Sequence, residues 1–223
     1  MQPYNQENIA AIATSSGKGA LAIVRISGKE LKGLYKLITN KNPKTRYALY
    51  TKILHPNKKN IIDHGVVIYY NAPNSFTGED IIEIICHGGV VTTNLILNGI
   101  LDFGVRQASP GEFSLRAFLN NKIDLVQAES ISSLINSSSI METKLNLDNL
   151  DGKISIFLNN IKNEILELLS IIENELNFSE DEIDHMKIKN IKKIVNKIKN
   201  KINELLTSSL IGKNIFSGIR IVL

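Results

Sequence analysis

The chain has 223 residues, a formal net charge of +4 and one cysteine, and 43% of its residues are hydrophobic. This length suffices for one large or two modest domains, whereas a single cysteine excludes an internal disulfide and any zinc site built from several cysteines. No apolar run reaches the roughly 18 residues of a transmembrane helix, and residues 1–8 are too polar for a signal peptide, so we expect a cytoplasmic protein with no membrane partner.

Two apolar, β-prone runs come first, at residues 8–13 and 20–27. The Gly-rich loop between them contains Lys18, which is compatible with phosphate binding. The loop lacks the spacing of a Walker A motif, however, and the alternative is a plain turn between two strands. Arg25 interrupts the second run. Because a charge inside an apolar strand is costly alone, Arg25 predicts a carboxylate partner.

A helix and a hairpin are predicted next. Residues 29–39 have the spacing of a short amphipathic helix, and the alternation over residues 45–54 and 61–70 predicts two strands joined by a turn. His55 and His64 have no Cys, Asp or Glu at ligand spacing, so we predict no metal site.

The most informative stretch is residues 73–89. It opens with the turn residues Pro73 and Asn74, and the Ile-rich run over residues 81–85 then predicts a short strand that is buried on both faces. Glu83 lies in the middle of that run. A carboxylate among isoleucines has to be ion-paired, hydrogen-bonded or protonated, unless it faces solvent at a sheet edge. An ion pair between Arg25 and Glu83 would cost less free energy than two separate charges in apolar strands.

The end of this stretch combines a thiol, an imidazole and two glycines. Neighbours on an extended backbone point to opposite faces, so we interpret Cys86 as a small buried hydrophobe rather than a nucleophile paired with His87. Gly88 and Gly89 allow a tight turn and close approach to a ligand at a helix N-terminus. Residues 90–101 have the spacing of that helix.

Capping signals define the next elements. Residues 106–108 predict a short strand, and Ser109 then begins a helix as its N-cap, with Glu112 as the capping-box partner. Capping is a sufficient structural explanation for Glu112. Asp124 is predicted to cap the following helix with Gln127 as its box partner.

From Leu125 onward the pattern is purely helical, so we place a domain boundary near residue 120. The predicted fold class is α+β, with a mixed α/β domain over residues 1–120 and an all-α helical-bundle domain over residues 121–215. Apolar residues from Leu147 to Leu176 predict one helix of about eight turns. A lysine-rich partner over residues 188–205 packs antiparallel to it. Its lysines are interpreted as a solvated face.

Four motifs occur in order along the chain. They are PNSFTGED followed by E and HGG within residues 73–89, IAT with IVRISG within 12–28, PGEF with RAFLN within 110–120, and KIDL with QAE within 122–129. Together they resemble the signature of the MnmE (TrmE) family of tRNA modification GTPases, and the resemblance covers essentially the whole chain. Ser15 and Ser16 depart from the two prolines usual in the family.

The resemblance implies an N-terminal domain similar to the folate-binding domain of aminomethyltransferases. Such a domain binds a tetrahydrofolate derivative, such as 5-formyltetrahydrofolate, as one-carbon donor, and it forms homodimers. The family's folate-contacting positions match Arg25, Glu83 and Lys122. A carboxylate such as Glu83 suits the paired donors of a pterin ring, and Arg25 or Lys122 suits the glutamate tail. No catalytic residue is assigned within the chain.

The resemblance also implies a function in tRNA modification. With its FAD-dependent partner MnmG, the family installs a carboxymethylaminomethyl or aminomethyl group on C5 of the wobble uridine, U34, of certain tRNAs. Residues 216–223 match the first strand of the family's inserted GTPase domain, and no GxxxxGK[ST] loop occurs in the printed sequence. We therefore expect GTP, Mg²⁺ and K⁺ to be bound only by a full-length family member.

Two other interpretations of function are open at this stage. One is a free-standing folate-dependent aminomethyltransferase, which would need a catalytic acid and a substrate domain in place of the helices. The other is a non-catalytic helical interaction module. No aromatic residues interleave the lysines of residues 187–201, so a stacking single-strand binder is not favoured. A test of folate binding separates the tRNA modification protein and the aminomethyltransferase, which both bind folate, from the interaction module.

Overall fold

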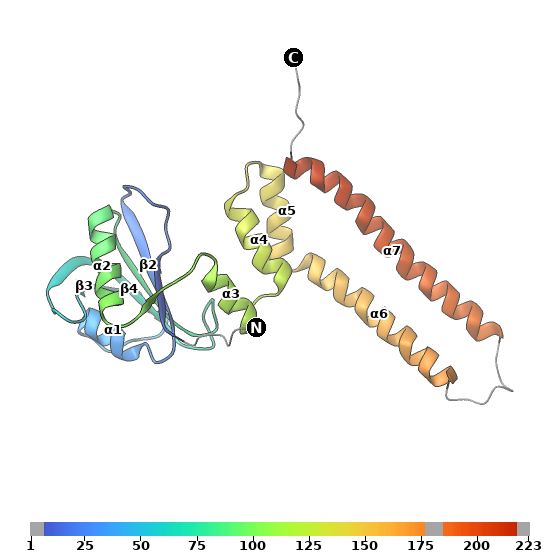
Figure 1. Ribbon diagram of the computed structural model, residues 1–223, viewed down its shortest axis with the longest axis horizontal. Helices are drawn as coiled ribbons and strands as arrows, with labels where there is room; N and C mark the ends of the chain where they lie inside the picture. Colours follow the sequence, from blue (N-terminus) through green and yellow to red (C-terminus); the bar gives the residue numbers. More distant parts are fainter. Residues whose placement is uncertain (1–6, 177–184, 218–223) are drawn as a thin grey trace, which may run out of the picture. The chain divides into compact units, whose positions relative to one another are not determined.

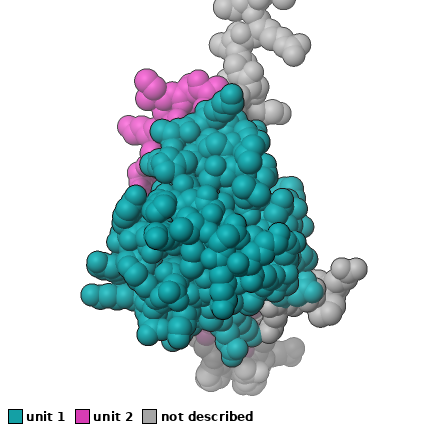
Figure 2. Space-filling model, turned by 90° about the vertical axis from the view of Figure 1, so that its left-hand side faces the viewer, with its two compact units in different colours: residues 1–123 teal, residues 124–223 magenta. Residues whose placement is uncertain are grey.

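The computed structural model describes residues 7–176 and 185–217, and the chain divides into two compact units, residues 1–123 and 124–223 (Figures 1 and 2). Unit 1 contains a sheet with helices, and unit 2 is helical. The predicted α+β fold class is confirmed. Within the described residues, none of the helices combines the length and the apolar character needed to span a membrane.

Unit 1 is built on a six-stranded sheet with the order β3-β4-β5-β2-β1-β6. The strands are β1 (Ile9–Ile12), β2 (Leu21–Gly28), β3 (Leu49–Leu54), β4 (Ile61–Tyr70), β5 (Asp80–His87) and β6 (Arg106–Gln107). Neighbouring strands are antiparallel, except that β6 runs parallel to β1. The sheet therefore pairs β1, the first strand of the unit, with β6, a strand that lies about a hundred residues later in the sequence.

Helices α1 (Lys32–Thr39) and α2 (Val90–Asp102) cover one face of this sheet (Figure 1). Alternate residues of β5, such as Ile82 and Ile84, are fully buried beneath them. On the opposite face burial falls along the strand, from buried Ile81 to half-buried Ile85 and exposed His87. Burial on both faces is thus wrong for most of this strand, because the core helices cover only one side of the sheet.

Two local predictions in unit 1 differ from the structure. The strand expected from residue 45 starts at Leu49, because Arg46 has a left-handed backbone with a φ of 56°. Helix α3 (Glu112–Leu119) starts at Glu112 with Gly111 as N-cap, at a φ of 75°. Ser109 therefore lies outside the helix, although its N–H still donates to the Glu112 carboxylate over 2.8 Å.

Unit 2 consists of α4 (Leu125–Ile135), α5 (Ile140–Leu150), α6 (Lys153–Leu176) and α7 (His185–Ser217). The predicted capping box is confirmed, since the Asp124 carboxylate accepts from the Gln127 N–H at 2.9 Å and the Gln127 side chain accepts from the Asp124 N–H at 3.0 Å. The single helix predicted from Leu147 to Leu176 is wrong, because Gly152, with a φ of 84°, separates α5 from α6.

The antiparallel pairing of the last two helices is confirmed. Ile161 of α6 and Ile198 of α7 are both buried. The Lys201 ammonium lies 2.6 Å from the Glu164 carboxylate. Of the strand predicted over residues 216–223, the first two residues end α7, and residues 218–223 lie outside the described part of the chain.

Candidate functional site

Arg25 and Glu83 face each other across β2 and β5, as direct partners in the strand register. The Arg25 Nε and Nη2 atoms both donate to Glu83 Oε1, at 2.9 and 2.6 Å. The predicted ion pair is confirmed. Both side chains keep some contact with solvent, with exposed fractions of 28% and 16%. The pair therefore bonds the two strands on the sheet face that α1 and α2 leave uncovered.

Aromatic residues surround this pair. The guanidinium carbon of Arg25 lies 5.7 Å from the ring centres of both Phe76 and Phe113. The Tyr70 hydroxyl donates to the second oxygen of Glu83, Oε2, at 3.2 Å. Burial raises the pKa of Tyr70, and the adjacent Glu83 raises it further, so this hydroxyl keeps its proton. Each oxygen of the Glu83 carboxylate thus accepts from a fixed donor.

A cleft of about 520 Å³ opens beside the pair. Its lining residues are Arg46, Ala48, Ile68, Tyr70, Asn74, Ser75, Phe76 and Lys122. Lys122 donates from Nζ to the carbonyl oxygen of Pro73 at 3.0 Å, and Arg46 donates from Nη2 to that of Asn74 at 3.1 Å. Two cations and two aromatic rings therefore line one cavity, which suits a ligand with a flat ring and an anionic group.

The three residues singled out by sequence lie close together but not in one contact. Arg25 and Glu83 bind each other, whereas Lys122 lines the cleft. Tyr70 connects them, because it lines the cleft and donates to Glu83. Sequence reasoning missed Arg46 and Tyr70, since both occur in ordinary strand-like alternation and no local signal marks them as site residues.

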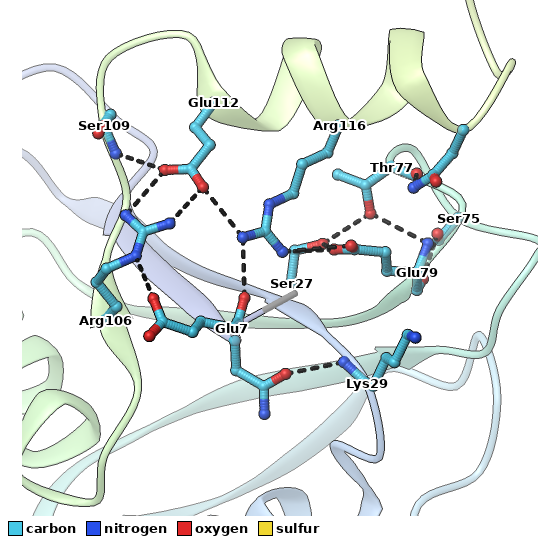
Figure 3. A network of polar contacts seen from close by, with 12 residues as sticks. Glu7, Ser27, Lys29, Ser75, Thr77, Glu79, Arg106, Ser109, Glu112 and Arg116 are labelled. Atoms are coloured by element: carbon cyan, nitrogen blue, oxygen red, sulfur yellow. Dashed lines mark hydrogen bonds and ion pairs between the residues drawn. The ribbon is translucent and has the colours of Figure 1, made fainter. Parts of the chain in front are cut away.

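A polar network lies behind the turn that carries Phe76 (Figure 3). The guanidinium of Arg116 is fully buried and binds the carboxylates of Glu79, at 3.0 Å, and Glu112, at 3.0 Å. Glu112 also accepts from Arg106 Nη2 at 2.5 Å. Burial raises the pKa of Glu112, but hydrogen bonds from Arg106, the Ser109 amide and Arg116 lower it more, to about 2. Glu112 is thus a charged partner of two arginines as well as a capping residue.

The two glycines after β5 have different surroundings. A Cβ on Gly88 would lie 2.5 Å from the carbonyl oxygen of Gly19, so the close approach here is to the neighbouring backbone rather than to a ligand. Gly89 is the N-cap of α2, as expected. His87 binds Asp63, with 2.8 Å between Nδ1 and Oδ1. Among the described residues, no three His, Cys, Asp or Glu side chains are grouped so that they could hold a metal ion.

Comparisons with known proteins match both units. The family model described as "GTP-binding protein TrmE N-terminus" matches residues 8–122, and the one described as "MnmE helical domain" matches residues 125–220. The first match falls on unit 1, which contains the sheet, and the second falls on unit 2, which is helical.

Curated relatives match along almost the whole chain. The tRNA modification GTPase MnmE of Francisella philomiragia is 39% identical over 220 residues, which cover 99% of this chain and 48% of that protein. The protein of the same name from Coxiella burnetii is 40% identical over 217 residues, or 97% and 48% of the two chains. The one from Nitrosomonas eutropha is 39% identical over 219 residues, or 98% and 48%.

The chain spans about half the length of the curated relatives that it matches. The two matched family models are the N-terminal and the helical domain of one protein family. The chain belongs to the MnmE (TrmE) family.

Proposed function

We propose that this chain acts in the modification of the tRNA wobble uridine, U34, and that unit 1 binds a tetrahydrofolate derivative in the cleft beside the Arg25–Glu83 pair. Family membership supports the first part. The observation that carries the second is the cleft itself, where the cations of Arg46 and Lys122 and the rings of Tyr70 and Phe76 line one cavity.

The residues of the cleft fit a folate chemically. Its volume of about 520 Å³ lies within the range of small-molecule sites. Phe76 and Tyr70 supply aromatic surface for the pterin ring, and Lys122 and Arg46 supply positive charge for the carboxylates of the glutamate tail. Arg25 already binds Glu83, so we assign the tail to the two cations of the cleft rather than to Arg25.

Glu83 would orient the ring. Its Oε2 atom accepts from the Tyr70 hydroxyl, and a carboxylate oxygen has capacity for a second donor, such as an amino group of the ring. Arg25 fixes the direction of the carboxylate through two hydrogen bonds. A bound folate supplies the one-carbon unit for C5 of the uridine, and the residues described here bind and orient it.

The remaining parts of the proposal concern partners. In this proposal unit 1 forms a homodimer, the chain acts with the FAD protein MnmG on tRNA, and GTP hydrolysis with Mg²⁺ and K⁺ belongs to the half of the curated relatives that this chain does not cover. The printed name of those relatives, tRNA modification GTPase, supports the link to GTP and tRNA, and the absence of a GxxxxGK[ST] loop from the printed sequence supports the division.

Calorimetric titration with 5-formyltetrahydrofolate tests the site. Glu83→Gln keeps the size of the side chain but places a donor opposite the donors of the ring, so we expect affinity to fall by about tenfold to a hundredfold. Glu164→Gln, which alters a carboxylate of unit 2, is the matched control and is expected to bind normally.

Thermal melts of the same proteins separate binding from folding. If the Arg25–Glu83 pair only joins two strands, Glu83→Gln and Arg25→Ala lower the melting temperature without a selective effect on the ligand. Normal affinity in a folded Glu83→Gln protein would remove Glu83 from the site, and absence of binding by the unaltered chain would refute the folate proposal.

A further inference from the structure

The turn over residues 73–80 forms one wall of the cleft, and its inner side is bound to the protein by buried polar side chains (Figure 3). The hydroxyl of Thr77, fully buried, lies 2.7 Å from that of Ser27 on β2. The same Ser27 hydroxyl donates to Glu79 Oε2 at 2.8 Å. Ser75 donates to the carbonyl oxygen of Glu79, which closes the turn on itself. Glu79 thus connects the turn both to β2, through Ser27, and to itself, through Ser75.

The positive charge of Arg116 is paired with the carboxylate of Glu79. Its Nη1 atom donates to both carboxylate oxygens of Glu79, at 3.2 and 3.0 Å, while its Nη2 atom donates to Glu112 at 3.0 Å and to the carbonyl oxygen of Glu7 at 2.8 Å. The guanidinium is 0% exposed. A planar group whose two terminal nitrogens donate to Glu79, Glu112 and Glu7 leaves little freedom for Glu79 to move.

The segment that follows α3 contributes Lys122 to the lining of the cleft. The amide of Lys122 donates to the carbonyl oxygen of Ala117 at 2.8 Å, and the side-chain amide of Asn120 donates to that of Thr77 at 2.7 Å. Lys122 then reaches back to Pro73 from its side chain. Helix α3 therefore binds the turn through Arg116, and the segment that directly follows α3 binds it through Asn120 and Lys122.

We propose that Arg116 is a positioning residue of the ligand cleft. It touches no ligand; through Glu79 it fixes the turn so that Phe76 and the carbonyl groups bound by Arg46 and Lys122 hold one arrangement before a ligand arrives. A wall that is ordered in advance costs less entropy on binding, so affinity depends on a side chain outside the cleft. The identity of the ligand rests on the proposed function, whereas the ordering of the turn does not.

Arg106 offers a matched control. It also binds Glu112, with 2.5 Å between Nη2 and Oε1, and it binds the carboxylate of Glu7 at 3.0 Å. Its remaining hydrogen bond goes to the carbonyl oxygen of Gln107, so none of its hydrogen-bond partners is in the turn. Arg106→Gln therefore removes an arginine from the same carboxylate without releasing Glu79.

The ordering of the turn can be measured without a ligand. The chain has no tryptophan, so Phe76→Trp places a single indole on the turn. In this background we expect acrylamide quenching of the indole to increase about twofold with Arg116→Gln or Glu79→Gln, because the turn opens locally more often, and to stay unchanged with Arg106→Gln. Equal quenching in all of these proteins, or an equal increase with Arg106→Gln, would overturn the proposal.

Glu79→Gln keeps the test decisive if Arg116→Gln does not fold, because it leaves Arg116 bound to Glu112 and Glu7. In that case an unchanged quenching constant with Glu79→Gln overturns the proposal on its own. Circular dichroism melts identify the folded variants.

Titration with 5-formyltetrahydrofolate then adds the functional arm, with Phe76 unaltered. We expect affinity to fall about tenfold with Arg116→Gln or Glu79→Gln and to remain normal with Arg106→Gln. Normal binding by folded Arg116→Gln and Glu79→Gln proteins would refute the positioning role. If the unaltered chain does not bind, the folate proposal fails, while the quenching result still decides whether Arg116 orders the turn.

Discussion

The two units use polar side chains in different ways. In unit 1 the ion pairs join distant parts of the sequence: Arg25 and Glu83 are 58 residues apart, and Arg106 and Glu7 are 99 residues apart. In unit 2 the capping box joins Asp124 to Gln127, three residues away. Unit 1 therefore obtains its candidate site from tertiary structure, whereas much of the polar bonding in unit 2 follows from local helix rules.

Of the substitutions considered, Arg116→Gln should cause the largest loss in the free energy of unfolding of unit 1. It leaves the buried carboxylates of Glu79 and Glu112 without the guanidinium between them, and removing one member of a buried ion pair costs about 3 to 5 kcal/mol. Urea unfolding followed by the fluorescence of a tryptophan at position 76 measures the loss in unit 1. A cost below about 1 kcal/mol would show that the cluster behaves as a surface one.

Acid should weaken unit 1 through Glu112. Its pKa is about 2 in the folded chain against an ordinary value of 4.5, so its contribution is complete above about pH 5 and is lost as the pH falls toward 2. The full difference corresponds to about 3 kcal/mol, of which about 2 kcal/mol is lost between pH 7 and pH 3. Urea unfolding at pH 7 and pH 3 measures it, and Glu112→Gln should remove this part of the pH dependence. An identical acid response in Glu112→Gln would assign the effect to other groups.

Asp124→Ala tests the local rules of unit 2. Removing an N-cap side chain exposes amide groups at the start of α4 and costs about 1 kcal/mol. Far-ultraviolet circular dichroism during thermal unfolding reports this change. Asp148→Ala is the control, because it removes a carboxylate inside α5 that caps no helix. Equal effects of the two substitutions would mean that charge, and not capping, matters at residue 124.

Lys201→Gln should have the smallest effect. Lys201 and Glu164 are 33% and 25% exposed, and the Lys197 ammonium lies 3.6 Å from the same carboxylate and can replace the lost partner. We expect no change in the unfolding midpoint beyond experimental error, and a reduced response to added salt. A loss comparable to that of Arg116→Gln would remove the contrast between the two units.

The Arg25–Glu83 pair is predictable from sequence because each charge interrupts an apolar strand, and a buried charge needs a partner. Arg116 carries no such signal. It lies on a short helix of mixed polarity. Because helix capping is a sufficient explanation for Glu112, that residue does not indicate a buried arginine nearby. Its burial follows only from the meeting of Glu7, Glu79 and Glu112, which lie on three separate segments.

Backbone conformation accounts for other differences. The apolar spacing from Leu147 to Leu176 continues across Gly152, so periodicity alone predicts one helix, whereas the left-handed φ of that glycine ends α5. Arg46 enters the cleft for a related reason, since its left-handed backbone interrupts an alternating stretch that reads as a strand. Periodicity detects buried faces, but it does not detect a single residue that changes the direction of the chain.

The hydrogen bond from Arg116 to the carbonyl oxygen of Glu7 has a consequence for synthesis of the chain. On the ribosome β1 can pair with β2 as soon as both have emerged, but its other neighbour, β6, and the arginine that binds Glu7 are translated about a hundred residues later. A nascent chain that stops before β6 leaves one edge of β1 and the carboxylate of Glu79 without these partners. Unit 1 therefore completes its fold only after α3 has left the exit tunnel, and until β6 has emerged β1 is an open edge for chaperones or for other nascent chains.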